Sequence, residues 1–150
     1  DLIRRALVLL ADHELNASTF AARVAASTGA SLAAAALAGL SALSGPLHGG
    51  MAARVQDLAD EAVRLGPRAC VTRRLAEDIP FPGFGHNLYP EGDPRAAALL
   101  GVLPVPPMFQ ALRREVETAT GLKANIDFAL VALAEALKLP PDAPNVLHFA

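Results

Sequence analysis

The chain consists of helix-length segments that Gly and Pro residues separate, and this pattern constrains the fold more than any other. In one segment, apolar side chains recur every three or four positions, at Met51, Val55, Leu58, Ala62 and Leu65. That spacing places them on one face of a helix, which the Gly-Pro pair after Leu65 ends. No stretch alternates polar and apolar residues as a half-buried strand does. The sequence therefore predicts an all-α fold with short connections.

The same pattern predicts the other helices. Their expected ranges are 2–11, 16–28, 31–43, 69–78, 107–120 and 125–138, with one helix starting at Pro94 and another opening within residues 144–150. Asn16 or Ser18 is expected to cap the second helix, and Asp93 the helix that Pro94 starts. Expected inward side chains of the last two full helices are Met108, Leu112, Val116, Ile126, Leu130, Leu133 and Leu137.

The segment over residues 31–43 differs from the others because it is almost uniformly apolar. A helix without a polar face is expected to be buried on all sides. The apolar run ends at Ser44, which makes it too short to span a membrane. If its covering partners are missing, such a helix should drive self-association.

Length, charge and cysteine content exclude several function classes. A chain of 150 residues can build a domain with a sizeable core, and a net charge of −2 gives no sign of nucleic-acid binding. The single cysteine, Cys70, has no nearby His or Cys and indicates neither a zinc site nor a thiol nucleophile. We expect no metal site. The chain starts with Asp1 and stops at the opening of a helix, so we expect a fragment of a longer protein.

Residues that can carry chemistry are concentrated in five short motifs, over residues 12–19, 45–50, 82–86, 93–95 and 125–128. His48 lies between Pro46 and a Gly pair, where a helix start would disfavour the imidazolium and leave a neutral hydrogen-bond donor. An ordinary histidine in a Gly-Pro turn is the alternative. Asp127 is either a general base or a carboxylate that complements the first turn of its helix.

The remaining motifs leave similar alternatives. His86 ends the run Pro82-Gly83-Phe84-Gly85 inside an irregular loop over residues 79–92, where it is either a site residue or part of a surface turn. Arg95 can bind a carboxylate at a helix start, or it is a solvated arginine. His13 between Asp12 and Glu14 has a salt-bridged surface histidine as its alternative. His148 belongs to no motif, and we expect a structural role for it.

In this order, the five motifs resemble the citrate synthase family, and the resemblance covers nearly the whole chain. It implies that Asp127 takes a methyl proton from acetyl-CoA while His48 donates a hydrogen bond to the thioester oxygen. It further implies that His86 polarises the ketone of oxaloacetate and that His13 and Arg95 bind the oxaloacetate oxygens. Backbone groups of Pro82, Gly83, Phe84 and Gly85 would line the adenine end of CoA.

The resemblance also implies an architecture and a setting. Residues 1–45 would be helices of a large domain, 46–138 the small domain with the catalytic loops, and 139–150 a return to the large domain. The family is a two-domain, cytoplasmic homodimer of the tricarboxylic acid cycle that closes over its substrates and holds no tightly bound cofactor. Neither a membrane nor a nucleic acid is an expected partner. Further carboxylate-binding arginines of the family would lie beyond Ala150, so the fragment alone is expected to be inactive.

Three segments depart from the family pattern. Asn87 and residues 89–91 replace an arginine and a lysine, which removes positive charge where CoA phosphates are expected. Residues 51–53 and 129–131 also differ from the usual Ala-Asn-Glu and Tyr-Ser-Gly. These changes favour either another acyl-CoA or 2-oxo acid as substrate, or a ligand-binding or regulatory protein without turnover. The five retained residues favour the acyltransferase, because a binding protein has no need of a carbon-acid base.

Overall fold

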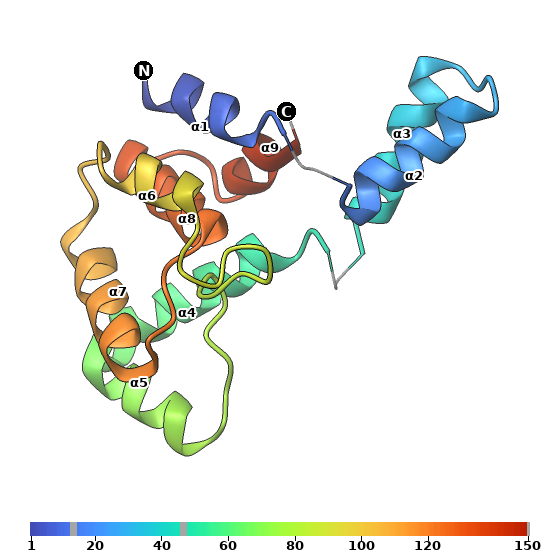
Figure 1. The fold of residues 1–150 in the computed structure, drawn as a ribbon. Helices are drawn as coiled ribbons and strands as arrows, with labels where there is room; N and C mark the ends of the chain where they lie inside the picture. The colour runs from blue at the N-terminus through green and yellow to red at the C-terminus, as the bar shows by residue number, and fades with distance from the viewer. Residues whose placement is uncertain (13–14, 46–47, 150) are drawn as a thin grey trace. The chain divides into compact units, whose positions relative to one another are not determined.

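The computed structural model describes residues 1–12, 15–45 and 48–149, and these residues form helices and no strand (Figure 1). The helices are α1 (Leu2–Leu10), α2 (Ala17–Ser27), α3 (Leu32–Leu43), α4 (Met51–Leu65), α5 (Pro67–Ala76), α6 (Pro94–Leu100), α7 (Pro107–Thr120), α8 (Ile126–Leu137) and α9 (Ala143–Phe149). The all-α prediction is confirmed. Asn16 caps α2 by accepting a hydrogen bond from the Thr19 backbone N–H (2.8 Å), and Asp93 caps α6 in the same way.

Contacts divide the chain into two units, and each is described by itself. The hairpin unit, Ala11–Met51, contains α2 and α3. The larger unit consists of Asp1–Leu10 and the chain from Ala52 onward. The domain boundaries expected after residues 45 and 138 stay a prediction.

The core of the larger unit is built around α8. Eight of its residues, Ile126 and the run from Phe128 to Ala134, are buried. The Phe128 ring lies 4.9 Å from the Phe84 ring and 5.6 Å from the Phe109 ring, measured between centroids. Leu137 is 38% exposed, so its predicted inward position is wrong: it is the last helical residue, where the helix leaves the core. A helix buried this completely gives the residues at its start a fixed position.

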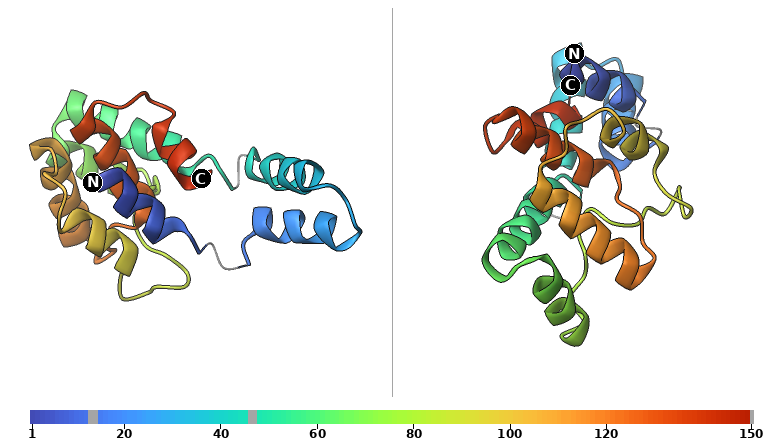
Figure 2. Two further views of the ribbon diagram at one scale, coloured as in Figure 1. Left: turned by 90° about the horizontal axis from the view of Figure 1, so that it is seen from above. Right: turned by 90° about the vertical axis from the view of Figure 1, so that its left-hand side faces the viewer.

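The first and last helices of the chain lie together in the larger unit. Helix α1 contacts both α6 and α9, and the two views of Figure 2 show it beside α9. Ala6 and Leu10 are the buried residues of α1. The sequence on either side of the hairpin unit therefore belongs to one packed body.

In the hairpin unit, α2 and α3 pack closely against each other. A Cβ atom on Gly39 would lie 3.3 Å from both the Ala22 Cβ and the Ser18 carbonyl oxygen, so glycine permits this approach. The predicted burial of α3 on all sides is wrong for this chain. Only Ala35, Gly39 and Leu43 are buried, while Leu32, Leu37 and Leu40 are exposed. The two helices cover only one stripe of each other, and none of the other described residues of the unit covers the rest of α3.

The irregular loop over residues 79–92 is fixed at its start by a buried ion pair. Arg74 of α5 donates to the Pro80 carbonyl oxygen (2.7 Å) and pairs with the Glu61 carboxylate of α4 at 2.7 Å. Both charged side chains are buried. Because a buried charge is costly unless all its hydrogen bonds are made, this geometry tolerates little movement. The pair therefore sets where the loop leaves α5.

Further along, the same loop is bound to the segment that precedes α8. The Gly85 backbone N–H donates to the Lys123 carbonyl oxygen (2.8 Å), and the Asn125 N–H donates to the Gly83 carbonyl oxygen (2.9 Å). Gly83 has φ +83°, and a Cβ there would lie 2.7 Å from a Val55 methyl group. Glycine is required at this position for both its backbone conformation and its packing. The pairing delivers His86 to the start of α8.

Candidate active site

Asn125 connects the His86 loop to the start of α8. Its side-chain oxygen accepts hydrogen bonds from the backbone N–H groups of Asp127 (3.0 Å) and Phe128 (3.4 Å). Its amide nitrogen donates to the Gly85 carbonyl oxygen (2.9 Å). One carboxamide therefore caps α8 and fixes the residue before His86, so the two motifs that contain Gly85 and Asn125 meet.

Asp93 makes a second connection, between α6 and α8. Its Oδ1 accepts from the Arg95 backbone N–H and from Arg95 Nε, each at 3.0 Å. Its Oδ2 accepts from the other arm of the Arg95 guanidinium (2.9 Å) and from the Ile126 backbone N–H (3.0 Å). Burial alone would raise the pKa of the Asp93 carboxyl, but the hydrogen bonds and charge of Arg95 outweigh it and lower that pKa. Asp93 is therefore an ionised anchor that orients Arg95.

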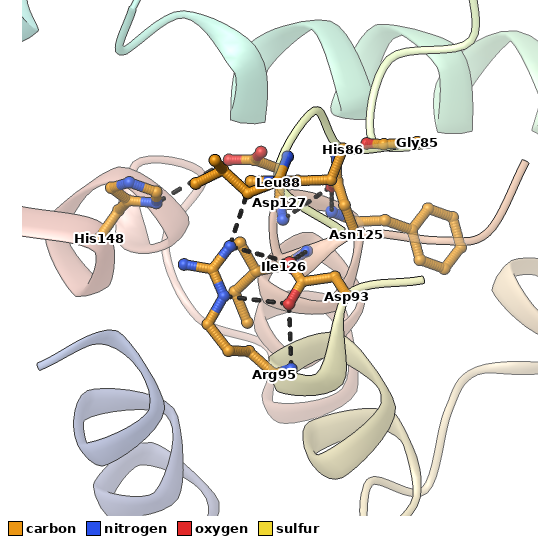
Figure 3. A network of polar contacts seen from close by, with 10 residues as sticks. Gly85, His86, Leu88, Asp93, Arg95, Asn125, Ile126, Asp127 and His148 are labelled. Carbon is orange, nitrogen blue, oxygen red and sulfur yellow. Dashed lines mark hydrogen bonds and ion pairs between the residues drawn. The ribbon is translucent and has the colours of Figure 1, made fainter. Parts of the chain in front are cut away.

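His86 lies against Arg95 and Tyr89. Its Nε2 is 3.3 Å from a terminal nitrogen of Arg95, and its ring centroid is 4.9 Å from that of Tyr89 (Figure 3). The Arg95 guanidinium carbon is 5.3 Å from the same Tyr89 ring centroid, within the range of a cation–π contact. Tyr89 therefore supports both groups from one side.

The hydrogen bonds of His86 fix the position of its ring. The Leu88 backbone N–H donates to Nδ1 (3.2 Å), and a backbone amide can only donate. A guanidinium N–H can likewise only donate, and Arg95 faces Nε2 at 3.3 Å, so donors approach both ring nitrogens and the contacts are compatible with either tautomer. His86 and Arg95 thus lie side by side, where a carbonyl or carboxylate oxygen of a ligand can take the place of their mutual contact.

Asp127 is the acidic group of this site. Burial raises the pKa of its carboxyl to about 6; the charge of Arg95 opposes the rise and that of Asp93 adds to it. A fifth of the side chain is exposed. A carboxylate with a pKa near 6 is still mostly ionised at neutral pH and is a stronger base than an exposed one. The neighbouring histidine is His148 of α9, whose Nδ1 lies 3.9 Å from Asp127 Oδ1.

His48 lies in the hairpin unit, in the turn over residues 48–50 directly before α4. Its Nε2 is 3.0 Å from the Ser18 hydroxyl oxygen and accepts from the Ser18 backbone N–H (3.3 Å). The Ser18 hydroxyl also donates to Asn16 Oδ1 (2.9 Å), so the two Ser18 contacts hold the imidazole at Nε2 and are compatible with either tautomer. A side chain at Gly49 would overlap the Leu43 carbonyl oxygen, so this turn requires glycine. The role of His48 as a neutral donor stays a prediction.

The structure therefore places the predicted residues as follows. His86, Arg95 and Asp127 share the larger unit, and His48 lies in the hairpin unit. His13 lies outside the described residues. Within the loop, Gly83 and Gly85 use backbone groups to pair with residues 123–125, and Phe84 is buried against Phe128, so a ligand would meet the opposite edge of this segment.

The sequence does not predict three contacts of the candidate residues, those made by Ser18, Asn125 and His148. It indicates only a cap for Ser18, a helix start for Asn125 and a structural role for His148. The contacts of Ser18 and Asn125 span 30 and 40 residues, which no local pattern reveals. Their position inside the recognised motifs was the one available signal.

Three other features of the described residues concern metal binding, the membrane and the single cysteine. Across residues 1–12, 15–45 and 48–149, no three His, Cys, Asp or Glu side chains are grouped so that they could hold a metal ion. None of the helices described there has the length and apolar character needed to cross a membrane. Cys70 is buried and free.

Comparisons with known sequences point to one family. A family model described as citrate synthase, C-terminal domain, matches residues 1–150. A "Putative citrate synthase 2" of Mycobacterium tuberculosis is 50% identical over 93 residues, which cover 61% of this chain and 25% of that protein. A 2-methylcitrate synthase of the same organism is 33% identical over 135 residues, covering 83% and 34%. The chain thus spans about a quarter to a third of the length of these curated relatives.

Comparisons with solved structures point to the same family. Citryl-CoA lyase from Hydrogenobacter thermophilus is 28% identical, with a TM-score of 0.84 over 99% of this chain and 62% of that chain. A ternary complex of citrate synthase from Thermoplasma acidophilum with carboxymethyl coenzyme A and oxaloacetate is 26% identical. Its TM-score is 0.73, and the match covers 99% of this chain and 43% of that one.

Proposed function

The chain belongs to the citrate synthase family, and from that premise we propose that it supplies catalytic residues to an acyl-CoA condensing enzyme. The proposed reaction joins acetyl-CoA, or a related acyl-CoA, to oxaloacetate or a related 2-oxo acid and releases CoA. The observation that carries the proposal is Asp127, a carboxylate whose pKa is raised by burial, in the same unit as the adjacent side chains of His86 and Arg95. A related citrate synthase binds a CoA analogue together with oxaloacetate.

In the first step Asp127 takes a proton from the acyl methyl group, and the C–H electrons form an enolate or enol. The C–H bonds next to a thioester carbonyl are only weakly acidic, so the negative charge that develops on the thioester oxygen needs a hydrogen-bond donor to stabilise it. His48 is proposed to supply it through Nδ1–H, because its other ring nitrogen, Nε2, faces Ser18. A neutral donor suits this role because it stabilises the charge without adding a counter-ion to the ground state.

In the second step the new carbon nucleophile attacks the ketone carbon of the oxo acid. The ketone oxygen becomes a hydroxyl group by taking a proton from His86, and the proton that Asp127 gained in the first step restores the ring before the next turnover. Arg95, oriented by Asp93, binds a carboxylate of the same substrate through a charge-assisted hydrogen bond. His13 is proposed as a further ligand of the oxo acid, on the family resemblance alone. Water then cleaves the thioester and releases CoA.

The remaining assignments are proposals as well. We propose that Pro82, Gly83, Phe84 and Gly85 contribute to the CoA site and that no cofactor is held tightly. Four further predictions follow from the family resemblance. They are domains bounded at residues 45 and 138, a homodimer, a cytoplasmic location and a role in the tricarboxylic acid cycle. Inactivity of the isolated 150-residue chain is also a prediction.

The experiment that tests the function measures thiol release from acetyl-CoA and propionyl-CoA with oxaloacetate, using the full-length protein. Asp127→Asn should lower kcat by roughly 10²- to 10⁴-fold, the usual contribution of a general base. Oxo-acid affinity should change little, because Asp127 acts on the other substrate. Asp142→Asn, which removes an exposed carboxylate before α9, is the matched control and should retain wild-type kcat.

Two results separate the alternatives. Wild-type kcat in the Asp127→Asn variant would remove the base assignment. Calorimetric binding of acyl-CoA and oxo acid without thiol release from any substrate pair would instead support a regulatory protein without turnover.

A further inference from the structure

A histidine outside the five motifs stands next to the proposed base. His148 lies on α9, and α9 packs on α8, which carries Asp127. The two side chains are 26% and 20% exposed, and His148 Nδ1 is 3.9 Å from Asp127 Oδ1. Figure 3 shows the imidazole directed at the carboxylate from the α9 side. The distance exceeds a hydrogen bond but allows a strong interaction between opposite charges.

The other charges around Asp127 leave a role for this imidazole. From α6, Arg95 attracts the carboxylate, but Asp93 already pairs with that guanidinium at 2.9 Å and itself repels Asp127. From the loop, His86 lies against Arg95, and the Tyr89 ring lies 5.3 Å from the same guanidinium. Of these charges, Arg95 acts most strongly on Asp127, and Asp93 partly offsets it. His148 is the group on α9 that can add a positive charge when it is protonated.

We propose that His148 is a positioning residue for the base, whose protonated imidazole holds the Asp127 carboxylate ionised and turned toward α9 until the acyl substrate binds. The proposal rests on the function proposed above, in which Asp127 is the base. It adds a residue that acts through Asp127 and need not touch the substrate. The proton stays on His148 and none is transferred in this role.

The expected size follows from the geometry. A cation within about 4–6 Å of a carboxylate lowers its pKa by about 1–3 units, and partial exposure reduces this effect. We therefore expect His148→Asn, which removes the cation, to raise the pKa of Asp127 by about 0.5–1 unit. Lysine at this position restores a permanent cation and should return the pKa to the wild-type value or lower. By reciprocity, Asp127→Asn should lower the pKa of His148 by a similar amount.

The test follows ionisation directly, so it does not depend on turnover. The full-length protein is labelled with ¹³C at aspartate carboxyls and ¹⁵N at histidines, and both are titrated by NMR between about pH 4 and 9, with Asp127 assigned by its loss in Asp127→Asn. The variants are His148→Asn, His148→Gln and His148→Lys, with Asp142→Asn as the control that should leave Asp127 unchanged. The proposal is supported if the pKa of Asp127 rises in the two neutral variants and is at the wild-type value or lower in the lysine variant.

Three results would overturn it. The first is an Asp127 pKa that is unchanged in both neutral variants. The second is an Asp127 pKa that rises as much in the lysine variant as in the neutral variants, which would indicate a structural disturbance. The third is a His148 pKa that is the same in Asp127→Asn as in the wild type. The thiol-release assay on the same samples tests the condensing function separately. If Asp127 and His148 shift each other's pKa but no thiol is released, the proposed function is contradicted while the coupling between the two residues is established.

Discussion

The hairpin unit and the larger unit each hold one site histidine through a backbone N–H, yet they support it very differently. Ser18 holds His48 at Nε2, and Leu88 holds His86 at Nδ1. In the larger unit, Asn125 and Asp93 tie the residues around His86 to α8, eight of whose residues are buried. In the hairpin unit, α2 has no buried residue and α3 exposes three leucines.

The difference indicates where the site gets its rigidity. The larger unit can position Arg95, His86 and Asp127 with its own core. The hairpin unit buries too little apolar surface to be stable alone, since a single pair of helices makes only a small core. His48 therefore has less packed support within its own unit than His86 has.

The largest expected effect comes from breaking the buried network of the larger unit. Arg95→Leu leaves the Asp93 carboxylate buried without its partner, which typically destabilises a protein by about 3–5 kcal/mol. Arg113→Leu is the matched control, because the Arg113 side chain is 39% exposed and its ion pair with Glu117 should contribute about 0–1 kcal/mol. Urea denaturation of both full-length variants measures the difference. Equal losses would show that the Asp93–Arg95 pair does not hold the site together.

The Arg95 variant also sharpens the assignment of the substrate pocket. At a temperature where it remains folded, oxaloacetate binding should weaken more than acetyl-CoA binding, because a carboxylate loses its charge-assisted partner. Calorimetry with each ligand measures this. Equal weakening of both would assign Arg95 a structural role only.

The next effect concerns the exposed face of the hairpin unit. We expect a second copy of the chain to cover the apolar face of α3, so Leu37→Glu with Leu40→Glu should convert a dimer to a monomer. Val63→Glu on α4 is the matched control in the larger unit, since Val63 is similarly exposed but lies beside the polar face of its helix. Light scattering of the full-length variants gives the mass. A wild-type monomer, or a dimer that survives the double substitution, would contradict the role of this face.

The smallest effect separates backbone from side-chain control of His48. Ser18→Ala removes the hydroxyl group but keeps the backbone N–H that contacts His48 Nε2. Losing one such hydrogen bond costs about 0.5–1.5 kcal/mol, so kcat should fall by about tenfold or less. Histidine ¹⁵N shifts should show the same tautomer. A loss above about a hundredfold, with a changed tautomer, would show that the hydroxyl group decides the protonation of His48.

The sequence predicted the helices well because local signals determine them. Asn16 and Asp93 cap helices as expected, and Gly and Pro end most of the segments near the predicted positions. The sequence could not predict what covers α3, because uniform apolarity demands burial without naming the partner. Leu137 was misplaced because periodicity does not show where a helix leaves the core.

The candidate residues were predicted largely through the family resemblance, and the contacts that support them were not. The pairing of Asn125 with Gly85 and the approach of His148 to Asp127 depend on how helices pack, and these residues are far apart or outside the motifs. Likewise, the raised pKa of Asp127 follows from burial that no short motif encodes.

The central claim is that Asp127 is a base of raised pKa, and methyl-proton exchange tests it most directly. The full-length protein is incubated in D₂O with acetyl-CoA and an unreactive oxaloacetate analogue, and loss of the methyl signal is followed by NMR from about pH 5 to 8. Because only the carboxylate accepts a proton, exchange should be present above the Asp127 pKa and be lost as pH falls through about 6. Asp127→Asn should abolish it. Exchange that is constant across this range, or that persists in Asp127→Asn, would contradict the account.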